Sequence, residues 1–178
     1  TYEPRDVVAS SSPSMDIQVA SNFERILLEA YGRDARAVRA LMSSLAQSRR
    51  FSLSPHALSR LRAVFSANRA DEQETAATIR TMLRETGQIV DPHTAVGIAV
   101  AEKEPRDPAV PNVVLATAHA AKFPDAVEAA CGVRPRLPDW LADLADRPER
   151  ITTLPADQAA VERHILSASR AAREGAAA

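Results

Sequence analysis

The chain has 178 residues, of which 46% are hydrophobic and 25% charged, and its net charge at pH 7 is −1. This length predicts one domain, or a domain and a half, of a soluble globular protein. The near-zero charge argues against nucleic acid or an anionic membrane as a partner. No apolar run approaches the ~20 residues needed to cross a bilayer. Cys131 is the single cysteine, which excludes an internal disulfide and favours a reducing, cytoplasmic compartment.

Residues 1–20 are predicted to form a short strand followed by a polar loop. Val7-Val8-Ala9 is the apolar piece, and the serine-rich run 10–14 with Pro13 is typical of turns. The chain starts without Met and only a few residues before Val7, so we expect it to be part of a longer protein. Its first residues lack the basic start and apolar centre of a signal peptide.

Residues 21–87 are predicted to form a helical subdomain, a bundle of about four short helices. Apolar side chains recur there with helical spacing: Phe23-Ile26-Leu27-Ala30, Val38-Leu41-Met42-Leu45, Leu58-Leu61-Val64-Phe65 and Ile79-Met82-Leu83. Asp34 and Ser54-Pro55 are typical helix starts. The acids at 71, 72 and 74 suit the positive end of a helix dipole, and Gly87 is a natural helix end.

Residues 88–178 are predicted to form an α/β segment with short strands at 88–90 and 112–116 and an extended or strand-like link at 150–153. Helices are expected from Asp91 to about Lys103, from Pro124 to Gly132, from Leu137 and from Leu154. So few separated strands cannot close a sheet, and we expect them to pair with polypeptide outside this sequence. The expected fold class is therefore helix-rich α/β, with strands that complete a sheet begun elsewhere.

Thr117 and His119 are candidate site residues, because they follow the apolar run 113–116. The residues alone leave open that Thr117 only caps the next turn and that His119 is structural. In open α/β sheets, ligands bind at the carboxyl ends of strands. Asp91 and His93 lie at a predicted helix start, which suits an anionic ligand, although helix capping is the favoured role for Asp91.

The polar loop contributes Ser14 and Asp16 as weaker candidates. Asp16 could bridge to Arg25 and so fix the loop. Asn22 and Glu24, which follow on a helix, are expected to cap and pair locally.

Several classes of site lack the residues they need. The five glycines are well separated, so no glycine-rich loop can wrap a phosphate. The histidines and Cys131 are scattered without metal-ligand spacing, so no metal site is expected. A Ser-His-Asp nucleophile site has no supporting context either.

Three segments, in this order, resemble the threonine synthases of the fungal and proteobacterial type. They are Ser12-Pro13-Ser14-Met15-Asp16-Ile17 leading to residues 21–25, Asp91-Pro92-His93-Thr94-Ala95-Val96-Gly97, and Ala116-Thr117-Ala118-His119-Ala120-Ala121-Lys122-Phe123. The chain departs from the family at Ala120, where proline is usual, and at Ser10-Ser11, where the family has Thr-Leu.

The resemblance implies the C-terminal portion of an enzyme with the tryptophan-synthase-β-like fold, type II of the pyridoxal phosphate enzymes. The implied reaction converts O-phosphohomoserine and water into threonine and phosphate. Thr117 would place its hydroxyl against the pyridine nitrogen of pyridoxal phosphate, and the loop with Ser14 and Asp16 would lie beside the cleft. The Schiff-base lysine would belong to the N-terminal portion, so Lys103 and Lys122 are expected to be non-catalytic and this segment alone inactive.

Two other interpretations stay open at this point. One is a non-catalytic helical interaction or regulatory module that keeps only the fold elements. The other is a different lyase with the same cofactor and fold type. The residues leave the oligomeric state open between monomer and homodimer.

Overall fold

The computed structural model describes residues 1–105 and 107–170. Within these residues the chain forms seven α-helices and four single turns of 3-10 helix, and it contains no strand. It divides into two compact units, residues 1–136 and 137–178. None of the described helices is both long enough and apolar enough to span a membrane.

Helices α1 (Phe23–Ala30), α2 (Ala35–Ser48) and α3 (Pro55–Arg62) form the first helical group. α1 packs against both α2 and α3. The core of this helical group is built on Leu27, Val38 and Phe51. The Tyr2 ring stacks on Phe23 and Phe51, with ring centroids 5.6 and 5.0 Å apart. An aromatic cluster therefore joins the start of the chain to this group.

The predicted starts of α2 and α3 are confirmed, because local side chains satisfy their first backbone N–H groups. The Asp34 carboxylate accepts hydrogen bonds from two backbone amides at the start of α2. The Ser54 hydroxyl accepts one from Ala57, with Pro55 at the first helical position. These contacts depend only on neighbouring residues, so the sequence pattern is enough to locate them.

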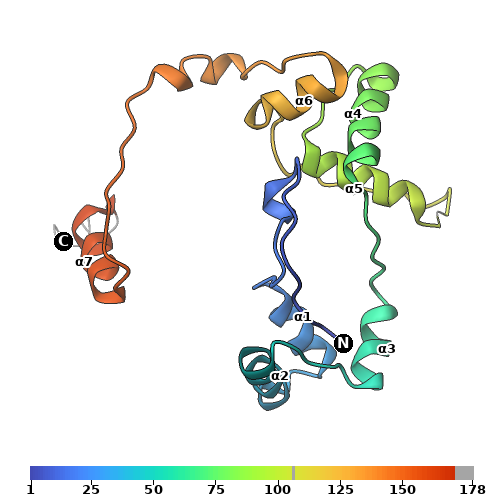
Figure 1. Cartoon of the computed structure of the whole chain (residues 1–178), viewed down its shortest axis with the longest axis vertical. Helices are drawn as coiled ribbons and strands as arrows, with labels where there is room; N and C mark the ends of the chain where they lie inside the picture. The colour runs from blue at the N-terminus through green and yellow to red at the C-terminus, as the bar shows by residue number, and fades with distance from the viewer. Residues whose placement is uncertain (106, 171–178) are drawn as a thin grey trace. The chain divides into compact units, whose positions relative to one another are not determined.

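Helices α4 (Glu72–Thr86), α5 (Pro92–Lys103) and α6 (Pro124–Cys131) form the second group. α4 packs against α5 and α6, and the three lie together in Figure 1. We predicted α4 in one bundle with the three helices before it, and that prediction is wrong. Buried Ile79 of α4 instead joins a core made with small and β-branched residues: Ala95, Ala120, Val127 and Ala130.

The ends of α4 and α6 follow the predicted signals. Asp71 and Glu74 form a reciprocal capping box at the start of α4. Gly87 and Gly132 end α4 and α6 in the left-handed conformation, with φ of 71° and 74°. Glycine adopts this conformation without the steric cost that a side chain would add.

The strand predictions are wrong for the described residues. Residues 7–9, 88–90 and 112–116 form no strand. Residues 150–153 belong to no helix or strand, which leaves the alternative of an extended link. Among the described residues, the β-type pairing is a single bridge between Tyr2 and Phe51. Residues 111–117 belong to no helix or strand, and Val113 and Leu115 are 77% and 74% exposed. A strand requires hydrogen bonds from a neighbouring strand, so an apolar, β-branched pattern alone does not produce one.

The unit 137–178 contains η3 (Asp139–Leu141), η4 (Leu144–Asp146) and α7 (Gln158–Ala168). The helix predicted from Leu137 is therefore two separate 3-10 turns. α7 starts later than the predicted Leu154, because the carboxylate of Asp157 accepts a hydrogen bond from Ala160 and caps it there.

Candidate functional site

Hydrogen bonds connect three segments that lie far apart in the sequence. The backbone N–H of Ser14 donates to His93 Nε2 over 3.1 Å. The backbone N–H of Thr117 donates to Thr94 Oγ1 over 3.2 Å. His93 and Thr94 belong to the first turn of α5, so this turn joins the polar loop to the segment that carries Thr117.

Asp91 is the centre of this arrangement. It is the N-cap of α5, and its side chain is fully buried. One carboxylate oxygen accepts from the backbone N–H and ring Nδ1 of His93, at 2.9 and 2.8 Å. The other accepts from the backbone N–H of Thr94, at 3.3 Å, and from its hydroxyl. Four donors therefore compensate for removing this carboxylate from water.

His93 acts as a bridge rather than a free acid or base. Its ring is 6% exposed, with Nδ1 at Asp91 and Nε2 at the Ser14 amide. Because an amide can only donate, Nε2 must accept, and the proton of the neutral ring lies on Nδ1. The ring also packs against Phe123, with centroids 4.7 Å apart. Both nitrogens are occupied, so His93 links the polar loop to the start of α5. Its part in binding an anionic ligand stays a prediction.

Thr117 is exposed, and its backbone N–H forms a hydrogen bond while its side-chain hydroxyl forms none with the described residues. Its N–H is bonded to Thr94, whereas Thr117 Oγ1 forms no hydrogen bond with the described residues. The adjoining extended segment approaches α5 closely at Gly97, where an added Cβ would lie 3.3 Å from Val114 Cγ1. The Thr117 hydroxyl therefore lies on an anchored backbone and is free to donate a hydrogen bond.

His119 caps a short turn. It is exposed, and its Nδ1 accepts a hydrogen bond from the backbone N–H of Ala121 over 3.1 Å, at the start of η2 (Ala120–Lys122). This contact orients the ring and leaves Nε2 without a partner among the described residues. The part of His119 in a ligand site stays a prediction.

Asp16 fixes the polar loop through Ser10, not through Arg25. Its two oxygens accept from the backbone N–H and the hydroxyl of Ser10, at 2.8 and 2.7 Å. The expected bridge to Arg25 is wrong for the described residues, where no ion pair joins the two. Capping by Asn22 is also wrong, because its side chain makes no hydrogen bond to α1. The loop contacts α4 as well, since Ser11 N–H donates to Glu72 over 3.1 Å.

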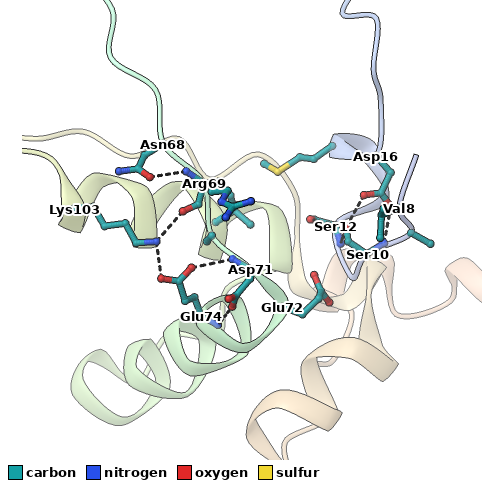
Figure 2. Close-up of a pocket in the computed structure, with 14 residues that line it drawn as sticks. Val8, Ser10, Ser12, Asp16, Asn68, Arg69, Asp71, Glu72, Glu74 and Lys103 are labelled. Carbon is teal, nitrogen blue, oxygen red and sulfur yellow. Dashed lines mark hydrogen bonds and ion pairs between the residues drawn. The ribbon is translucent and has the colours of Figure 1, made fainter. Parts of the chain in front are cut away.

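An open pocket of about 870 Å³ lies between this loop and the start of α4. Figure 2 shows Asp16, Ser10 and Ser12 on one side and Arg69, Glu74 and Lys103 on the other. Thr117, His119, Asp91, His93 and Ser14 do not line it. The described residues therefore bring Asp16 to the pocket but leave the Thr117 hydroxyl outside it.

The two lysines of the chain are an ion-paired residue, Lys103, and an exposed residue, Lys122. Lys103 Nζ lies 2.6 Å from Glu74 Oε1 and donates to the carbonyl of Arg69 over 2.7 Å, as Figure 2 shows. The hydrogen bond from Lys103 to Glu74, together with that from the Asp71 amide, lowers the pKa of the Glu74 carboxyl. Lys122 is exposed, with its Nζ 6.0 Å from the centre of the Phe123 ring. Neither lysine has the desolvated environment that makes an amine nucleophilic at neutral pH.

Groups that would hold a phosphate or a metal are not gathered in the described part of the chain. Its glycines lie at separate helix ends or inside α5, and none forms a phosphate-binding loop. The described residues include no cluster of His, Cys, Asp and Glu that could bind a metal ion.

Thr94 is the site residue whose role the sequence analysis missed. It is buried, and its hydroxyl contacts Asp91 and Thr117 at once. The Asp-Pro-His-Thr motif indicated a capped helix start, but the contact to Thr117 joins residues 23 positions apart. No local pattern encodes such a contact.

Comparison with known proteins gives consistent matches. The family described as "Threonine synthase, C-terminal" matches residues 94–165. The threonine synthase of Pseudomonas aeruginosa is 41% identical over 92% of this chain and 35% of its own length. That of Corynebacterium glutamicum is 36% identical over 92% of this chain and 34% of its own length. The chain thus spans about a third of these relatives.

Solved structures match as well. A crystal structure of PLP-bound threonine synthase from Brucella melitensis is 53% identical, with a TM-score of 0.82, over 95% of this chain and 36% of its own. Yeast threonine synthase is 28% identical, with a TM-score of 0.76, over 92% of this chain and 37% of its own. The similarity therefore extends over nearly all of the present sequence.

Proposed function

The chain belongs to the threonine synthase family and matches its C-terminal part, and from this premise we propose that it completes an enzyme converting O-phosphohomoserine and water into threonine and phosphate. The observation that carries the proposal is the linked arrangement of Ser14, Asp91, His93 and Thr117. All three motifs that resemble the family meet in one hydrogen-bonded site.

Pyridoxal phosphate is the proposed cofactor, and when bound it acts as an electron sink for bonds at the amino acid's α carbon. Thr117 would donate its hydroxyl hydrogen to the pyridine nitrogen. A neutral hydroxyl does not favour the protonated ring as a carboxylate would. This chain's contribution is thus to set the electronic character of the ring, which favours elimination and replacement chemistry.

The rest of the site must come from the remainder of the protein. The lysine that binds the cofactor and the groups that hold its phosphate are proposed to lie N-terminal to this sequence. The exposed apolar side chains of Val8, Val113 and Leu115 are proposed to pack against that portion. By itself the present segment is proposed to be inactive.

The division into a loop region 1–20, a helical region 21–87 and a return segment 88–178 stays a prediction about boundaries in the sequence, although α4 packs against helices of the return segment. So do the roles of Ser14, Asp16 and His119 beside the substrate. A cytoplasmic location, expected from the single free Cys131, is likewise a prediction. The oligomeric state is left between monomer and homodimer.

The proposal is tested by replacing Thr117 in the complete protein that the gene encodes, called the full chain below. Thr117→Val keeps the shape and removes the donor, whereas Thr117→Ser keeps the donor. We expect Thr117→Val to shift the absorption spectrum of the bound cofactor and to lower kcat at least tenfold, which corresponds to about 1.4 kcal/mol of transition-state stabilisation. Thr117→Ser should retain the spectrum and most of the activity.

Two results would contradict the proposal. One is that the full chain, supplied with pyridoxal phosphate, forms no threonine from O-phosphohomoserine. The other is that Thr117→Val leaves both spectrum and kcat unchanged. The gene sequence upstream offers an inexpensive check, because we expect it to encode a lysine-bearing portion rich in Gly and Asn rather than an unrelated domain.

A further inference from the structure

The segment 111–118, which carries Thr117, makes few hydrogen bonds to the rest of the described chain. Between described residues, positions 111–118 make one hydrogen bond, from the Thr117 N–H to Thr94 Oγ1. Val114 also approaches α5, where a Cβ added at Gly97 would lie 3.3 Å from Val114 Cγ1. The location of Thr117 therefore depends on where the Thr94 hydroxyl is held.

The Thr94 hydroxyl has a fixed direction. It lies in hydrogen-bonding contact with the buried carboxylate of Asp91. A carboxylate can only accept, so the Thr94 hydroxyl hydrogen points to Asp91 and its lone pairs remain for the Thr117 amide. The bonds run in one direction, from the Thr117 N–H through the Thr94 hydroxyl to the Asp91 carboxylate.

We propose that Thr94, held by Asp91, is a positioning residue that sets where the Thr117 hydroxyl meets the cofactor. The inference rests on the proposed cofactor contact of Thr117. It gives the buried Asp91 a function beyond helix capping, since helix capping requires only its bonds to the backbone N–H groups of His93 and Thr94. The side-chain bond to Thr94 is additional, and it is the bond that orients the hydroxyl.

The Asp91 carboxylate also holds the polar loop that contains Ser14, through His93. Its other oxygen holds His93 Nδ1, whose Nε2 accepts from the Ser14 amide. Ser14 and Thr117 are thus both fixed through Asp91, by separate oxygens. The effect of Thr94 on Thr117 can therefore be tested while the branch through His93 is left intact.

The test compares Thr94→Val, which keeps the shape without the hydroxyl, with Thr94→Ser, which keeps the hydroxyl. In the cofactor-free full chain, amide hydrogen exchange at Thr117 should be at least tenfold faster in Thr94→Val and unchanged in Thr94→Ser. In the cofactor-bound chain, Thr94→Val should shift the cofactor spectrum in the same direction as Thr117→Val. It should lower kcat about tenfold with little change in KM. If Thr94→Val does not fold, Thr94→Ala takes its place.

The double variant separates positioning from a general structural role. If Thr94 acts through Thr117, then Thr94→Val adds no further spectral shift or loss of kcat in the Thr117→Val background. Additive effects would overturn the inference, as would unchanged exchange at Thr117. If Thr117→Val alone changes nothing, the cofactor contact fails and the inference falls with it. If Thr117→Val has its effects but Thr94→Val has none, only the inference fails.

Discussion

The two helical groups of residues 1–136 are built in different ways. In the group α1–α3, the buried positions are apolar, with Leu27, Val38 and Phe51 at the centre. In the group α4–α6, the core is mostly alanine with Ile79 and Val127, and four buried polar side chains lie beside it: Thr75, Asp91, His93 and Thr94. The small apolar residues allow the helix backbones of α4–α6 to lie close together, and hydrogen bonds of the buried polar side chains fix the orientation of the groups that they join.

The difference separates scaffold from site. Apolar contacts are non-directional and tolerate adjustment, so α1–α3 can supply stability without defining the position of a reacting group. Hydrogen bonds to a buried carboxylate require particular distances and angles. The proposed chemistry lies next to α5, where the directional contacts are.

The largest expected effect on stability is in the apolar group. Leu27 is completely buried, and Leu27→Ala should destabilise α1–α3 by about 3 kcal/mol through lost burial and an unfilled cavity. Hydrogen exchange resolved by helix in the full chain measures the change for α1–α3 separately. Val64→Ala, at a position that is 74% exposed, is the matched control and should change little. Equal losses of protection in α5 would break the comparison, because the two groups would then unfold as one.

The next effect concerns the polar group. His93→Phe keeps a ring against Phe123 but leaves the Ser14 amide without its acceptor and Asp91 without one donor. We expect a loss of about 2 kcal/mol. We also expect faster exchange in residues 10–16, with α1 and α2 unaffected. His119→Phe is the control, because that exposed ring accepts one hydrogen bond from a short turn. Unchanged exchange at Ser14 in His93→Phe would show that the bridge does not hold the loop.

The same contrast explains which features could be predicted from the sequence. Helix starts at Asp34, Ser54 and Asp91 and the end at Gly132 depend on groups within a few residues, and the structure confirms them. The strand predicted at 112–116 is absent from the described residues, because a strand needs hydrogen bonds from a neighbouring strand and local sequence does not specify such a neighbour.

The packing of α4 and the site network were less accessible to prediction. The packing of α4 with α5 and α6 depends on contacts between elements, which periodicity does not specify. In the site, the sequence singled out Asp91, His93 and Thr117 individually. The connection through Thr94 required the fold.

The smallest expected effect is electrostatic and sharpens the comparison at the surface. Lys103 of α5 pairs with Glu74 of α4, and this contact holds the pKa of Glu74 below its ordinary value. A carboxyl with a lowered folded-state pKa contributes stability above the unfolded pKa and loses it as the pH falls. The difference in thermal midpoint between the natural chain and Glu74→Gln should therefore be small near pH 7. It should decline below about pH 4.3, the ordinary glutamate pKa, and shrink in high salt.

The matched control for that measurement is Glu29→Gln, which removes the exposed pair of Glu29 with Arg33 close by in sequence. That pair joins no second helix, so its loss should leave the midpoint nearly unchanged at every pH. A Glu74→Gln difference that persists at pH 3 would show that capping or packing, which the neutral amide also alters, outweighs the charge. A pH-dependent difference absent from Glu29→Gln would show that α4 and α5 are joined by directional polar contacts at their exposed edge as well as in the buried site.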